Sequence, residues 1–186
     1  VAATTTIVDV PQMLALGGTC DSSLPTGGWN PPVVYTCARF NGGDPTGLDV
    51  LDKKVYVSAE VSPYLYITDT NGALLNPTCN NAQNPQFVTF TNGFNTGVAL
   101  NDIRVARSSN GRVYAYAAAN AAAKQFQVFD VTDIEQPVRI ASSTLATAAG
   151  SNPEGFRVYY YDKKAYIVTR ETFGNKLHVF DVSHPE

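Results

Sequence analysis

The chain has 186 residues, of which 44% are hydrophobic and 16% are charged, so it can bury a core as one domain or as a short repeat array. Its net charge is −3, and Lys and Arg never form a run longer than a doublet, which excludes the clustered basic surface that nucleic acids and anionic membranes select. The longest uncharged segments are rich in Thr, Asn, Gly and Pro, so no transmembrane helix is predicted.

Residues 1–41 are predicted to hold the third and fourth strands of a first four-stranded unit, at 6–11 and 32–37. Cys20 and Cys37 bracket a Gly/Pro-rich loop, and a disulfide between them would stabilise the chain by about 3 kcal/mol on the chain-entropy model. Cys79 can compete for either partner, and three free thiols are the alternative. Because an exposed loop is an unusual place for a buried Trp, Trp29 in this loop is a candidate partner contact.

Residues 42–97 are predicted to form the second unit. The alternation of apolar and polar residues predicts strands at 47–51, 55–58 and 65–69, with a tight turn at 52–54. An Asn/Pro-rich insertion occupies 71–85, and we expect the fourth strand at 86–90.

Residues 98–150 hold the clearest unit, with predicted strands at 102–107, 112–117, 125–131 and 138–143. The pair Asn110-Gly111 is typical of a tight hairpin turn, because both residues tolerate positive φ. The alanine-rich segment 117–123 is interpreted as a loop, or at most one helical turn.

Residues 151–186 repeat the same order, with strands at 156–160, 165–169 and 177–182. The segment 165–168 is apolar at consecutive positions, which predicts a strand covered on both faces. The chain is therefore predicted to open at a third strand and to stop after another.

An aspartate ends each third strand, at Asp9, Asp69, Asp130 and Asp181. Self-similarity with a period of roughly 50–60 residues predicts one supersecondary unit used repeatedly. A carboxylate at this place can accept a hydrogen bond from a backbone N–H about two residues on. Since the residue recurs with its turn in every unit, we interpret it as a turn former rather than a catalytic group.

The pattern at 127–138, Gln-Val-Phe-Asp-Val-Thr-Asp-Ile-Glu-Gln-Pro-Val, resembles the strand ending of the LVIVD-repeat β-propellers. Residues 177–185 give a second match, with His184 in place of the usual Asp; the resemblance covers 98–186 well and 42–70 loosely. It implies an all-β fold of four-stranded antiparallel meander blades, a partial β-propeller of about three blades. It also implies a secreted or surface-attached protein, and no shared catalytic chemistry.

Propellers generally need about four to eight blades to close, so three interpretations of this short chain follow. It is a fragment of a longer propeller, it closes a ring with a second copy, or it assembles through exposed edge strands. The first residue is Val1 rather than Met, which is typical of a chain whose signal peptide has been removed or of a piece of a longer chain.

Few side chains suggest chemistry, and no catalytic, cofactor-binding or metal-ligating residue is predicted. Of the two histidines, His178 is interpreted as solvent-facing or capping. The acidic cluster Asp130, Asp133 and Glu135 is more typical of a solvated turn than of a calcium site, and the match of 69–72 to a calcium loop is weak. The run Tyr159, Tyr160 and Tyr161 must turn at least one ring outward, which makes these residues candidate ligand or partner contacts.

Two classes of function remain. The first is a noncatalytic extracellular module that binds a protein partner or self-assembles through blade edges. The second is a portion of a propeller enzyme, a metal-dependent lactonase-like hydrolase or a quinoprotein, with its site at the central channel. Only four residues, all just ahead of first strands, are available for the second class: Asn101, Asp102, Asn152 and Glu154.

Overall fold

The computed structural model describes residues 4–8, 34–39, 44–69, 88–89, 93–145, 154–170 and 174–185. These residues form strands, turns and bends and no helix, so the predicted all-β class is confirmed. The described segments accordingly offer no helix that could cross a bilayer. Two compact units are present: Val1–Asn41 with Gly72–Thr89, and Gly42–Asn71 with Phe90–Glu186.

The first unit contains one small sheet, formed by β1 (Thr4–Val8), β2 (Val34–Arg39) and β6 (Val88–Thr89). The antiparallel pair β1–β2 has a register shift between Ile7 and Val8, the two residues before Asp9. The backbone of Cys37 lies on β2, whereas Cys20, Cys79 and Trp29 lie outside the described residues.

The second unit begins with a four-stranded sheet in the order β3-β4-β5-β7. Its strands are β3 (Pro45–Leu51), β4 (Lys54–Ala59), β5 (Tyr64–Asp69) and β7 (Gly93–Asn95). Asp52 and Lys53 have φ of 50° and 61°, so β3 and β4 are joined by a tight hairpin turn that matches the twist of the strands.

The prediction of the fourth strand of this sheet at 86–90 is wrong. Val88 and Thr89 pair in parallel with Ala38 and Arg39 of the first unit, and β7 pairs with β5 instead. Gly93 allows this because a Cβ there would lie 1.9 Å from Cγ of Pro63. The close approach admits only glycine, and it brings Phe94 against the core.

A second sheet follows in the order β11-β10-β9-β8, a simple meander as predicted. Its strands are β8 (Ala99–Arg107), β9 (Val113–Asn120), β10 (Phe126–Asp130) and β11 (Val138–Ser143). The interpretation of 117–123 as a loop is wrong for its first half, because β9 continues to Asn120. The alanines there are buried, and small side chains let neighbouring sheets approach: a Cβ on Gly155 would lie 2.9 Å from the backbone nitrogen of Ala119.

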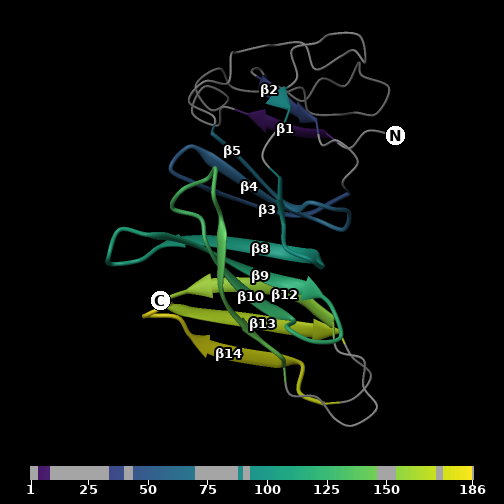
Figure 1. Ribbon diagram of the computed structural model, residues 1–186, viewed down its shortest axis with the longest axis vertical. Helices are drawn as coiled ribbons and strands as arrows, with labels where there is room; N and C mark the ends of the chain where they lie inside the picture. The colour runs from purple at the N-terminus through teal and green to yellow at the C-terminus, as the bar shows by residue number, and fades with distance from the viewer. Residues whose placement is uncertain are drawn as a thin grey trace, which may run out of the picture. The chain divides into compact units, whose positions relative to one another are not determined.

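The third sheet consists of β12 (Glu154–Tyr161), β13 (Lys164–Arg170) and β14 (Leu177–Asp181). The turn between β12 and β13 repeats the turn between β3 and β4, with Asp162 and Lys163 at φ of 46° and 58°. Figure 1 shows the three sheets of the second unit as successive layers, with β8–β11 in the middle. Stacked antiparallel meanders of this kind are what propeller-like blades are made of.

In the second unit, the first strand of each sheet has a register shift at the same place. The register shifts fall between Pro45 and Gly47, between Leu100 and Asp102, and between Gly155 and Arg157. The interval is 55 residues in both cases, from 45 to 100 and from 100 to 155. Counting from these shifts therefore identifies equivalent positions in the three sheets.

The aspartates at strand ends form the predicted turns. Asp130 Oδ1 accepts hydrogen bonds from the backbone N–H (3.0 Å) and from the hydroxyl (2.6 Å) of Thr132. Asp181 Oδ1 accepts from the N–H of Ser183 at 2.9 Å. Asp130 and Asp181 thus close turns, as the sequence predicted, while Asp9 and Thr70, the residue after Asp69, lie outside the described residues.

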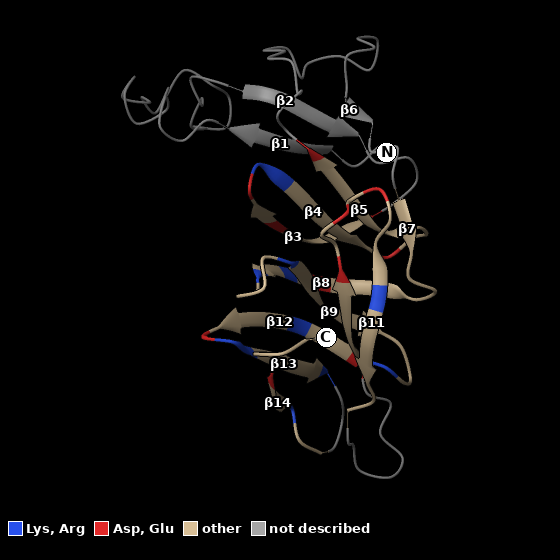
Figure 2. Ribbon diagram, turned by 60° about the vertical axis from the view of Figure 1, so that its left-hand side comes forward, with Lys and Arg blue, Asp and Glu red and all other residues tan. Residues whose placement is uncertain are grey.

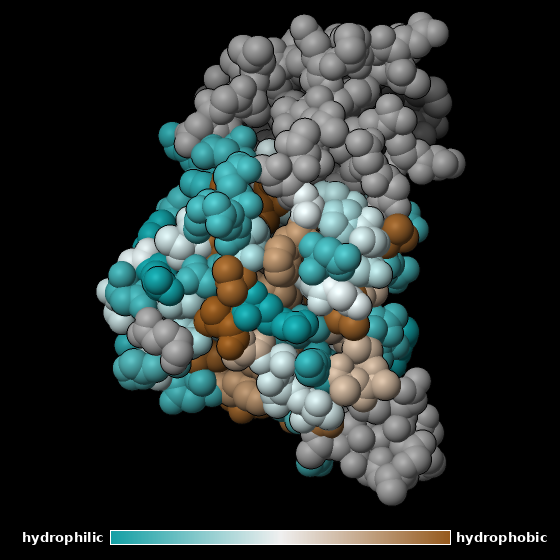
Figure 3. Space-filling model, viewed as in Figure 1, coloured by the Kyte–Doolittle hydropathy of each residue, from teal (hydrophilic) through white to brown (hydrophobic). Residues whose placement is uncertain are grey.

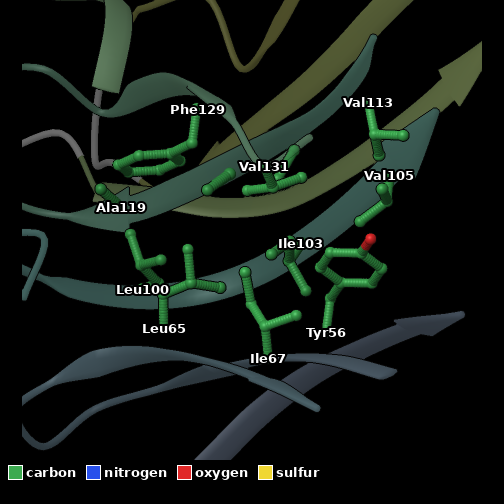
Figure 4. Close-up of a cluster of buried hydrophobic side chains, with 12 residues drawn as sticks. Tyr56, Leu65, Ile67, Leu100, Ile103, Val105, Val113, Ala119, Phe129 and Val131 are labelled. Carbon is green, nitrogen blue, oxygen red and sulfur yellow. The ribbon is translucent and has the colours of Figure 1, made fainter. Parts of the chain in front are cut away.

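The first core of the second unit lies between its sheet β3-β4-β5-β7 and its sheet β8–β11 (Figure 4). Tyr56, Leu65 and Ile67 project from β4 and β5 toward Leu100 and Ile103 of β8. Phe129 of β10 is fully buried at the same core and meets Phe94 edge-to-face, with ring centroids 5.8 Å apart. A second core between the middle and last sheets is dominated by stacked aromatic rings.

Burial of Tyr56 makes the stability of the protein sensitive to alkaline pH. Burial, reinforced by nearby acidic side chains such as Asp52, raises the pKa of Tyr56 from 10.0 to about 12. The unfolded chain therefore loses this proton at lower pH than the folded protein does, and the free energy of unfolding falls as pH rises from about 10 to about 12. We expect a contribution of about 2–3 kcal/mol from this residue.

Urea unfolding of the wild type and of Tyr56→Phe at pH 9 and pH 12 measures this contribution. The variant cannot ionise at this position, so its stability is expected to fall less over the same interval. Equal losses in the two proteins would contradict the assignment of this pH dependence to Tyr56.

Candidate partner-binding surface

The last sheet buries one face and exposes the other, because side chains alternate between the two faces of a strand. Val158, Ala165 and Ile167 point into the second core. The opposite face carries Tyr159 and Tyr161 of β12, Tyr166 and Val168 of β13, and Leu177 and Val179 of β14. We call these six residues the open face.

The open face is apolar and aromatic, yet it is exposed to solvent. Tyr159, Tyr161, Leu177 and Val179 are 60%, 64%, 59% and 52% exposed, respectively. Figure 3 shows hydrophobic residues interrupting the polar surface of the described chain. Contiguous apolar surface of this kind marks an interaction site more often than scattered single residues do.

Strand pairing holds these side chains in rows. Tyr159 lies opposite Tyr166, which lies opposite Val179, and Val168 lies opposite Leu177. The rings of Tyr159 and Tyr166 have centroids 6.5 Å apart at an interplanar angle of 49°. Because directly opposed side chains in a sheet are within contact distance, the rows form one continuous surface on a rigid base.

The structure separates the three predicted contact tyrosines. Tyr159 and Tyr161 point outward, but Tyr160 points into the second core. Its ring stacks on that of Tyr116, with centroids 5.3 Å apart and an interplanar angle of 10°. Tyr160 therefore holds the last two sheets together, and only its two neighbours are available to a partner.

The last sheet also carries charged residues (Figure 2). Lys164 of β13 lies opposite Asp181 of β14 in the strand register, at the end of the face. Hydrogen bonds from Ser183, with smaller help from Lys164, hold the pKa of the Asp181 carboxyl below its usual value. Arg157 of β12 lies opposite Val168, and its guanidinium donates to the Asn101 carbonyl oxygen at 3.1 Å and lies over the Phe156 ring.

The candidate residues of the enzyme alternative are engaged in contacts between sheets. Asn101 is buried, and its amide donates to Glu154 Oε1 and to the Gly155 carbonyl oxygen, both at 2.8 Å. Glu154 also pairs with Arg170 at 2.8 Å, and Asp102 Oδ2 accepts from the N–H of Val158 at 3.1 Å. Asn152 lies outside the described residues. The three described candidates thus join β8 to β12.

Neither histidine nor the acidic cluster Asp130, Asp133 and Glu135 belongs to a metal-binding arrangement among the residues that the structure describes. His178 is half-buried on the inner side of β14, and its Nε2 lies 2.9 Å from the Asn175 carbonyl oxygen. Asp133 caps its own turn by accepting from the N–H of Glu135 at 3.0 Å. Across the described segments, no three His, Cys, Asp or Glu side chains come close enough to bind a metal ion.

Sequence reasoning missed most of the open face. It expected 165–168 to be covered on both faces, but Val168 is 39% exposed. The expectation fails because β13 belongs to the outermost sheet of the described stack, and its apolar residues resemble those of strands that are covered. Leu177 and Val179 alternate with His178 and Phe180, which was the available signal.

Comparison with models of known protein families found no match, and a search of curated proteins found none either. The likeness to LVIVD-repeat propellers therefore stays a prediction from the motifs at 127–138 and 177–185.

Proposed function

We propose that the chain is a noncatalytic β-propeller-type module, extracellular or attached to a cell surface, that binds a protein partner or assembles with itself. The observation that carries this proposal is the open face, a rigid apolar and aromatic surface at the end of a stack of sheets. Tyrosine is enriched at protein interfaces because its ring buries apolar area while its hydroxyl finds polar partners.

The contacts of the polar residues weigh against the enzyme alternative. A metal-dependent hydrolase needs several oxygen or nitrogen ligands converging on an open site. The side chains of Asn101, Asp102 and Glu154 instead form hydrogen bonds between β8 and β12. Their arrangement supports a structural role and leaves the open face as the principal candidate for function.

Light scattering coupled to size-exclusion chromatography, together with elemental analysis, tests the proposal. We expect either self-assembly or a monomer that is captured by a protein partner, and no stoichiometric metal. A stoichiometric calcium or iron ion, or a bound quinone, would overturn the noncatalytic assignment.

A further inference from the structure

The three stacked sheets meet through equivalent strands. The first strand of each sheet lies on the first two strands of the sheet before it: β8 lies on β3 and β4, and β12 lies on β8 and β9. Hydrogen bonds accompany both junctions, since Asp49 Oδ2 accepts from Val105 N–H at 2.7 Å and Asp102 Oδ2 accepts from Val158 N–H. In the second unit, each sheet is therefore covered by the first strand of the next sheet in the same way.

The open face corresponds to a face that is covered one sheet earlier. Tyr166 and Val179 occupy the row that Tyr116 and Val128 occupy in the middle sheet, and there the last sheet buries them to 2% and 4% exposure. Leu177 and Val168 likewise correspond to Phe126 and Ala118, which are 4% and 0% exposed. The surface that fits the open face is thus the first strand of another such sheet.

Within the second unit, β3 is such a strand, at the opposite end of the three sheets. Leu48 lies three residues beyond the register shift at Pro45, as Ile103 and Val158 lie beyond theirs. Ile103 and Val158 point at the preceding sheet and are 0% and 2% exposed, whereas Leu48 is 43% exposed. Val50, equivalent to the 9% exposed Val105, is 55% exposed. Two apolar side chains of β3 therefore occupy contact positions that no other sheet of the second unit buries.

We propose that β3 of one copy packs on the open face of a second copy, so that the chain assembles head-to-tail. The proposal rests on the proposed function and names its partner: a second copy of this chain, docking through Leu48 and Val50. The contact is heterologous, so repetition gives a ring where the rotation closes and a filament where it does not. Both products bury the open face of every copy except at a free end.

Complementary variants test this arrangement in the full chain. Val50→Glu places a charge on β3 and leaves the open face intact, whereas Val168→Glu places a charge on the open face and leaves β3 intact. We expect the wild type to sediment as an assembly at about 100 µM, and each variant alone to sediment as a monomer. Mixed in equal amounts, the two variants are expected to form a one-to-one heterodimer, because the mixture retains one unaltered pair of surfaces.

Val138→Glu is the matched control, since Val138 of β11 is also 55% exposed but lies on neither surface. It should assemble as the wild type does, and circular dichroism melts should show that all three variants are folded. A wild type that stays monomeric, a mixture that stays monomeric, or assembly of Val50→Glu would overturn the head-to-tail arrangement. A monomer without bound metal leaves partner binding intact, whereas a stoichiometric metal or quinone overturns the proposed function itself.

Discussion

Phe129→Ala is expected to lower the free energy of unfolding by about 3–5 kcal/mol. Phe129 is fully buried at the core between the first two sheets, and its ring contacts Phe94 of β7 edge-to-face. Truncation removes the transfer free energy of the ring and leaves a cavity, because the strands that line it are fixed by their own hydrogen bonds. Urea unfolding followed by circular dichroism measures the difference.

Ile140→Ala is the matched control for this variant. Ile140 lies on the edge strand β11 of the same sheet and is 37% exposed, so its loss should cost less than about 1 kcal/mol. Equal destabilisation by both variants would contradict the assignment of Phe129 to the centre of the core.

Asp102→Ala is expected to destabilise the protein by about 2–3 kcal/mol. Asp102 is 3% exposed and lies on β8, which contacts both β3 and β12. Its carboxylate accepts from the N–H of Val158, pairs with Arg104 at 3.0 Å, and lies against Gly47, where a Cβ would be 2.5 Å from Oδ1. The variant leaves a buried backbone N–H without its acceptor, which costs more than the net gain from an average hydrogen bond.

Asp102→Asn separates the hydrogen bond from the charge. The amide oxygen can still accept from Val158 N–H, so the loss of stability should be smaller than for alanine. Thermal melts of the three proteins under identical conditions make the comparison. If asparagine destabilises as much as alanine, the ion pair with Arg104 rather than the hydrogen bond to Val158 carries the effect.

Sequence patterns predicted the strands of the last two sheets well, because those strands are bounded by strong turn signals such as Asn110-Gly111. The turn role of Asp130 and Asp181 was equally predictable, since it depends on residues only two positions away. Local chemistry decides these features, and a sequence displays local chemistry directly.

The predictions that were wrong concern features that depend on contacts between residues far apart in the sequence. β7 is a strand because Gly93 fits against Pro63 and Phe94 against Phe129, while 88–89 has better strand composition but pairs elsewhere. The alanines before Asn120 extend β9 because both faces of that strand are covered. Tertiary burial overrode intrinsic preference in both places.

The candidate surface was predictable only in part. Alternation guarantees that Tyr160 and its two neighbours point to opposite faces, but it does not say which face is inward. That choice follows from the register shift at Gly155, which sets the phase of β12 relative to the middle sheet. A single copy of the repeat shows no sequence pattern that would reveal this register shift.

The layered order of the second unit has a consequence for how the protein opens. Each sheet is stabilised mainly by its immediate neighbours, so cooperativity should decay along the stack rather than extend uniformly through it. In an unassembled chain the middle sheet has two neighbours, whereas the described residues pack β12–β14 on one. The amides of β12–β14 should then exchange with solvent deuterium earlier than those of β8 and β9. Local fraying at that end would then be the first step of unfolding.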